Sequence, residues 1–164
     1  MRKIILVWMT IGVLFLPAAV LAQTPHEVAG FVLGDQVSKY KEKLQMDTAQ
    51  PVRFFEAVKE VEIKPVRGIR SGLISYGVCA SPGEIVRIKI KYMDSSRDFY
   101  EKMLDELKKR YGEPDKWKGD AFGVVHIWKW FFKDKNGDEI SLVFQHNSQD
   151  PEIKLGNSIK LTHT

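Results

Sequence analysis

Residues 126–146, HIWKWFFKDKNGDEISLVFQH, constrain the fold of this chain more than any other stretch. Large apolar residues alternate with polar ones on both sides of the dipeptide Asn136-Gly137, which is a frequent β-turn sequence. This pattern predicts two antiparallel strands that bury one face. The same rings would also suit a binding groove rich in aromatic side chains, and this alternative stays open at the sequence level.

The register of the hairpin follows from which face can be apolar. A two-residue turn mixes large apolar and polar groups on both faces, whereas a three-residue loop, Lys135 to Gly137, separates them. A slip of one residue moves every side chain to the other face, so we predict the longer loop, with Gly137 in a left-handed bulge. The predicted pairs are Trp128 with Phe144, Trp130 with Leu142, and Phe132 with Ile140.

The remaining patterns predict a fold of the α+β class. We expect a mainly antiparallel sheet of about six strands with two helices on one face, in the order αβββαβββ. The first helix runs from Gly34 to Leu44, with a breaker at Thr48–Pro51, and the second is an amphipathic helix from Ser95 to Gly112. The expected strands are residues 53–63, 74–78, 86–92, the two arms of the hairpin, and 158–163, with residues 115–123 as a loop.

The first 22 residues predict a secretory signal peptide. Arg2 and Lys3 precede an uncharged apolar run, and Val20-Leu21-Ala22 has the small-x-Ala form of a cleavage site. An uncleaved anchor is the alternative, although the run is shorter than the ~20 residues that span a bilayer. We therefore expect a secreted or periplasmic protein with a single domain over residues 23–164 and no stable transmembrane segment after cleavage.

The net charge argues against a nucleic-acid partner, and the cysteine count argues against an internal disulfide. Without Arg2 and Lys3, 23 basic residues face 21 acidic ones, too small an excess to predict nucleic-acid binding. The single cysteine, Cys79, excludes a disulfide within the chain, and we expect it to be a small buried residue.

Two histidines form a candidate metal site. The predicted register places His126 opposite His146, with Cβ atoms ~5 Å apart. A specific site usually needs three or four ligands, and Asp120 and His163 are conceivable further ligands without a fixed position. Asp134, Asn136 and Asp138 begin like a calcium loop, but the glycine and glutamate required later in such a loop are missing, and a hairpin turn explains them.

A basic stripe is the candidate binding surface. Arg87, Lys89 and Lys91 alternate along one predicted strand and could contact an anionic lipid, a glycan or an acidic protein. The alternative is a solvated face in which they pair with an acidic stripe on a neighbouring strand. That stripe consists of Glu56, Glu60 and Glu62.

The sequence contains no phosphate-binding loop, dinucleotide fingerprint, serine elbow or zinc-protease helix. We therefore expect no cofactor and no catalytic residues. The leading hypothesis is a module that binds a partner protein or an envelope component without chemistry, through a sheet edge or an exposed sheet face. A metal- or small-ligand-binding protein is the first alternative, and a small hydrolase-like enzyme is the second.

Three segments carry a resemblance: GFVLGDQVSKY, KKRYGEPDKWKGD, and the tail IWKWFFKDKNGDEISLVFQHN with GNSIKLT. They resemble a group of small secreted bacterial proteins with no assigned activity. More distantly, the Leu33-Gly34 opening and the small α+β layout resemble the BamE-like outer-membrane assembly lipoproteins. This chain lacks their lipid-bearing cysteine. The resemblance implies a periplasmic interaction module and transfers no functional residue.

Overall fold

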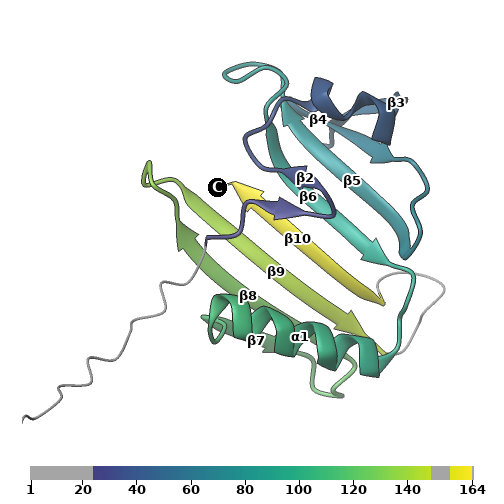
Figure 1. Cartoon of the computed structure of the whole chain (residues 1–164), viewed down its shortest axis with the longest axis vertical. Coiled ribbons are helices and arrows are strands. Elements are labelled where there is room, and N and C mark those ends of the chain that lie inside the picture. The colour runs from purple at the N-terminus through teal and green to yellow at the C-terminus, as the bar shows by residue number, and fades with distance from the viewer. Residues whose placement is uncertain (1–23, 149–155, 164) are drawn as a thin grey trace, which may run out of the picture.

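A computed structural model describes residues 24–148 and 156–163 (Figure 1). The predicted signal peptide, residues 1–22, lies outside the described residues. Those described form a two-stranded sheet, an eight-stranded antiparallel sheet, one 3-10 helix and one α-helix. In chain order these are β1 (Glu27–Val28), β2 (Phe31–Val32), η1 (Val37–Lys43), β3 (Leu44–Val52), β4 (Phe55–Ile63), β5 (Ile69–Gly77), β6 (Ile85–Tyr92), α1 (Arg97–Tyr111), β7 (Lys116–Gly119), β8 (Val125–Lys133), β9 (Glu139–Asn147) and β10 (Asn157–His163).

The large sheet has the order β3-β4-β5-β6-β10-β9-β8-β7. Each half of the chain contributes one helix followed by four strands that pair in succession. The last strands of the two halves, β6 and β10, pair antiparallel in the middle of the sheet. The prediction of an α+β fold, with a six-stranded sheet and two helices in the order αβββαβββ, is therefore wrong, because the described residues form a mostly β structure. The sheet has eight strands, a separate β1–β2 hairpin precedes it, and the first helix is a 3-10 helix of seven residues.

The first missed strand, β3, occupies residues that the sequence assigned to the end of a helix and a breaker. It is an edge strand whose pairing with β4 is interrupted by register shifts between Gln45 and Gln50 and between Pro51 and Val52. An edge strand tolerates proline because one side of it needs no ladder hydrogen bonds. Thr48 fills part of the gap, since its hydroxyl accepts a hydrogen bond from the Glu62 backbone N–H at 3.0 Å.

The second missed strand, β7, lies at the opposite edge, within the segment predicted as a loop. Trp117 pairs across the strands with Trp128, and their ring centroids are 6.1 Å apart. A Cβ atom on Gly119 would lie 2.5 Å from the Trp117 ring, so glycine leaves room for that ring against the backbone. A four-residue strand of this composition has no alternation long enough to identify it from the sequence.

The predicted hairpin register is confirmed. β8 and β9 pair Trp128 with Phe144, Trp130 with Leu142 and Phe132 with Ile140. Gly137 has φ +86°, as expected for its left-handed position, and the Asp134 N–H donates to the Asp138 carbonyl across the loop. Segregation of apolar side chains thus determined the pairing.

The core lies between the sheet and the elements on one of its faces, where α1 and β1–β2 are seen in front of the strands (Figure 1). Trp130 and Phe144 are fully buried, and the Tyr100 ring of α1 stacks on Phe144. The Trp128 N–H donates to the Tyr100 hydroxyl at 2.6 Å. These hairpin rings therefore pack against α1, which begins at Arg97, two residues after the predicted Ser95, with Ser96 as its N-cap.

Cys79 is exposed in the turn between β5 and β6, so the expectation of a buried cysteine is wrong. Cys79 follows the end of β5 and belongs to the exposed stretch 79–82, which does not pack against the core. Within the described residues, neither helix is both long and apolar enough to cross a membrane.

The burial of Tyr92 leads us to expect that the protein loses stability at alkaline pH. Burial raises the pKa of Tyr92 from 10.0 to about 12. Its phenol stays neutral in the fold while the unfolded chain ionises, so this stabilisation is complete below pH 10 and is lost as the pH rises from 10 to about 12. Two pH units correspond to about 2.7 kcal/mol. Urea unfolding measures the free energy of unfolding at pH 9 and at pH 12. The decrease between the two pH values should be larger in the wild type than in Tyr92→Phe, by up to about 2.7 kcal/mol. Equal drops would contradict the assignment.

Candidate functional site

The face of the eight-stranded sheet that points away from α1 is rich in basic side chains. Successive residues of a strand point to opposite faces, so the residues between the buried positions of each strand belong to this open face. Its basic members come from four strands. They are Arg87, Lys89 and Lys91 on β6, Lys160 on β10, Lys129 and Lys133 on β8, and Lys116 and Lys118 on β7.

Four of these lysines share one row across the sheet. Lys89 pairs directly with Lys160, and Lys160 pairs with Val143 of β9. Val143 pairs in turn with Lys129, which pairs with Lys116. Because neighbouring strands lie about 4.8 Å apart, the five positions span about 19 Å. We call these four lysines the lysine row.

Arg87 differs from its two neighbours on β6. Its guanidinium forms an ion pair with Glu60 at 2.5 Å and also donates to the Ser75 hydroxyl at 3.0 Å. The ion-pair alternative raised from the sequence therefore describes Arg87. Among the described residues, Lys89 and Lys91 are in no ion pair.

The pKa values of two lysines on the open face are lowered by burial and by neighbouring positive charges. Burial lowers the pKa of Lys160, and the nearby Arg87, Lys129 and Lys89 lower it further. The pKa of Lys91 is also lowered, first by burial and then by Lys89 and Arg70. Each shift means that the fold disfavours the ammonium form, so an anion brought to this face would relieve the repulsion.

A hollow of about 290 Å³ opens at the β4–β6 end of the lysine row. Lys89 and Lys91 border it beside Leu73, and the β4–β5 loop contributes Lys64. Glu62 is the acidic residue of its lining. The open face thus combines several ammonium groups with an adjacent depression of the size of a side chain or small anionic group.

The predicted histidine pair is brought together, but no third potential ligand converges on it among the described residues. His126 and His146 are directly opposite each other, and their ring centroids are 6.4 Å apart. Asn157 accepts a hydrogen bond from His146 Nδ1 at 2.8 Å, since its amide nitrogen already donates to two backbone carbonyls. His126 Nε2 is 3.0 Å from the Gly123 carbonyl oxygen. One nitrogen of each ring is therefore within hydrogen-bond distance of a local oxygen, whereas the buried His146 Nε2 has no hydrogen-bond partner among the described residues. Among the described residues, the group of potential ligands that converges lies elsewhere.

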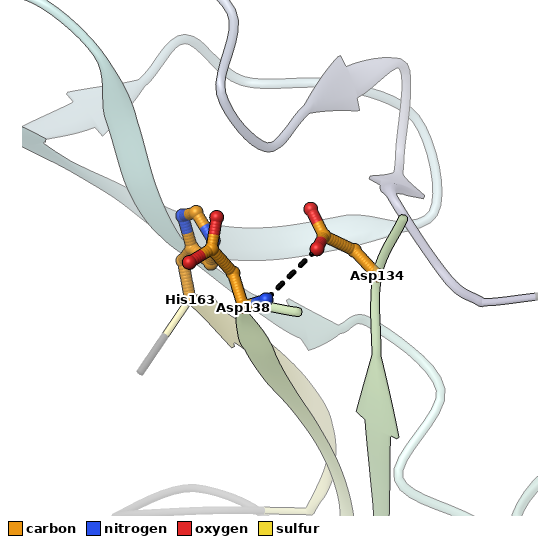
Figure 2. Close-up of side chains that lie close together, drawn as sticks. All are labelled: Asp134, Asp138 and His163. Carbon is orange, nitrogen blue, oxygen red and sulfur yellow. Dashed lines mark hydrogen bonds and ion pairs between the residues drawn. The ribbon is translucent and has the colours of Figure 1, made fainter. Parts of the chain in front are cut away.

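That group consists of Asp134, Asp138 and His163 (Figure 2). One potential ligand atom from each lies within 4.8 Å of the other two. Asp134 and Asp138 flank the β8–β9 loop, whereas His163 ends β10, which pairs with β9 and carries the imidazole to that loop. The sequence indicated Asp134 and Asp138 together, as the beginning of a calcium-like loop, and His163 as a conceivable ligand of the histidine pair. It gave no sign that β10 ends beside the hairpin loop.

No protein-family model, curated protein or solved structure matches this chain. The resemblance to small secreted bacterial proteins and to BamE-like lipoproteins therefore stays a prediction, and the function has to be inferred from the surfaces described above.

Proposed function

We propose that this protein is a secreted or periplasmic module that binds an acidic partner protein, without chemistry, through the open face of its sheet. The observation that carries the proposal is the lysine row. Its members come from both halves of the chain, so the row exists only where β6 and β10 pair at the centre of the sheet.

The first argument is energetic. Like charges placed directly opposite each other destabilise a sheet, yet Lys89 and Lys160 are such a pair and Lys129 adds to their repulsion. A surface selected for stability alone would place threonine or an acidic residue at one of these positions. Retention of several ammonium groups on one face is expected if they meet the negative charge of a partner.

The second argument concerns the kind of anion. Val143 interrupts the lysine row, Leu73 lies beside Lys89, and Phe131 on β8 of the same face is 49% exposed. A mixture of ammonium and apolar groups on a broad face suits a protein surface, which offers carboxylates and apolar side chains together. An isolated inorganic anion would need a few converging donors and no apolar contact area.

The proposal is tested by binding of fluorescent poly-L-glutamate at low and high salt. The wild type should bind it, with an affinity that falls as salt screens the charges. Lys89→Glu should weaken binding about tenfold, which corresponds to about 1.4 kcal/mol. Lys102→Glu, at an exposed position on α1, changes the net charge equally and should leave the affinity within about twofold of the wild type.

Equal losses in the two variants would mean that net charge, and not this face, governs binding. Vesicles containing anionic phospholipid and a sulphated polysaccharide serve as competing probes. If the protein binds either of these probes more strongly than poly-L-glutamate, and Lys89→Glu abolishes that binding, the partner is a lipid or a glycan and not an acidic protein. Absence of binding to all three probes would refute the proposed function.

A further inference from the structure

The cluster of Asp134, Asp138 and His163 lies at the strand ends, and it is formed by a different set of residues from the lysine row (Figure 2). We propose that these three side chains bind a divalent transition-metal ion, with zinc as the expected ion. The inference does not rest on the proposed function.

The two carboxylates are held by the hairpin loop. Asp134 Oδ1 accepts hydrogen bonds from the backbone N–H groups of Asn136 at 2.8 Å and Asp138 at 2.9 Å. These bonds fix the Asp134 carboxylate and use one of its two oxygens. Asp138 places its own Oδ2 3.6 Å from His163 Nε2, beyond hydrogen-bond distance. The loop thus offers two oxygen ligands from a backbone arrangement that is already formed.

The imidazole supplies an independent indication. The His163 side chain is 26% exposed, but its Nε2 atom is buried and has no hydrogen-bond partner among the described residues. His146 Nε2 also lacks a partner, but the converging group of three potential ligands includes His163 and not His146. A buried ring nitrogen without a partner is costly and needs an explanation such as an ion or a bound water. The nitrogen lies on the side of the ring that faces Asp138, so one metal ion could contact this nitrogen and both carboxylates.

The surroundings favour a cation. A hollow of about 380 Å³ is lined by the three cluster residues together with Asp35, Glu84 and His26. Within the part of the chain that the structure describes, four carboxylates and no lysine or arginine line this hollow, so this end of the sheet has the opposite sign to the open face.

The donor set selects the class of metal. One imidazole with two carboxylates suits zinc and similar divalent transition metals, whereas calcium takes six to eight oxygen ligands and rarely uses histidine. Zinc binds nitrogen at about 2.0–2.1 Å and carboxylate oxygen at about 2.0–2.2 Å. Ligand atoms within 4.8 Å of one another can reach these distances if the hairpin loop moves slightly toward His163, and a water or His26 can take a fourth position.

The test is calorimetric titration of the metal-free protein with zinc, followed by cobalt substitution and absorption spectroscopy. Asp134→Asn keeps an oxygen that can accept both loop hydrogen bonds, so it removes the charge with little change to the fold. Asp134→Asn, Asp138→Asn and His163→Gln should each weaken zinc binding by at least about tenfold. Asp105→Asn on α1 and His126→Gln are matched controls that should bind zinc like the wild type.

Circular dichroism and thermal unfolding without metal establish that each variant is folded. Loss of zinc binding in His126→Gln, with normal binding in the three cluster variants, would move the site to the histidine pair and overturn the inference. Failure of the wild type to bind zinc or cobalt at 100 µM would overturn it as well. Lys89→Glu should bind zinc normally, so failure of this inference and failure of the proposed function can be distinguished.

Discussion

Replacement of Trp130 by alanine should lower the free energy of unfolding by about 3–5 kcal/mol, the usual cost of deleting a buried aromatic side chain. Trp130 is 1% exposed in the centre of β8, where its ring lies between the sheet and α1. Its N–H donates to the Gly112 carbonyl at 2.9 Å, at the C-terminal end of α1. The substitution therefore opens a cavity and also removes the bond that fastens the end of the helix to the sheet.

Urea unfolding followed by far-UV circular dichroism measures this loss. Trp117→Ala is the matched control, because Trp117 lies at the sheet edge, is 56% exposed and should cost less than about 1 kcal/mol. Trp130→Phe keeps most of the ring and loses the hydrogen bond, so its cost should lie between the two. A Trp130→Ala loss as small as that of Trp117→Ala would show that the indole does not hold α1 on the sheet.

The double substitution Lys89→Gln with Lys160→Gln should change stability and binding in opposite directions. It removes a like-charge pair directly across β6 and β10, so the free energy of unfolding should rise, by up to about 1 kcal/mol. Binding of poly-L-glutamate should weaken about 100-fold if each ammonium contributes about 1.4 kcal/mol. A residue whose removal stabilises the fold while it weakens binding is retained for function.

The control for this experiment is Lys102→Gln with Lys109→Gln on the exposed side of α1, which removes the same charge. This control should change neither the free energy of unfolding nor the binding free energy of poly-L-glutamate by more than about 0.5 kcal/mol. A loss of stability in Lys89→Gln/Lys160→Gln would mean that the lysine row supports the fold. Unchanged binding would mean that the partner does not contact the row.

The hairpin shows how far alternation alone can predict a structure. Phe132, Trp130 and Trp128 were paired correctly because a single register puts all large rings on one face, and burial of that face outweighs any other arrangement. The antiparallel arrangement and the helix that ends at Gly112 were predicted by the same kind of local evidence.

The strands that the sequence did not predict are short or irregular and lack such alternation. The β1–β2 hairpin has two residues in each strand, β7 has four, and β3 contains Pro51 and two register shifts. None of them presents a continuous apolar face of its own. β3 and β7 pair with the otherwise unpaired sides of β4 and β8, and β1 and β2 pair with each other, so the cause of each strand lies partly outside its own residues.

The sequence by itself determined the β8–β9 register and the face on which its aromatic rings are buried, because the side-chain period of a strand and the gain from burying apolar area are local properties. The tertiary structure alone decided both candidate sites. Lys89 meets Lys160, and Asp138 meets His163, only because β10 inserts between β6 and β9. Pairing between β6 and β10, which lie far apart along the chain, and the register of β10 on β9 depend on how the whole sheet assembles, which no single segment specifies.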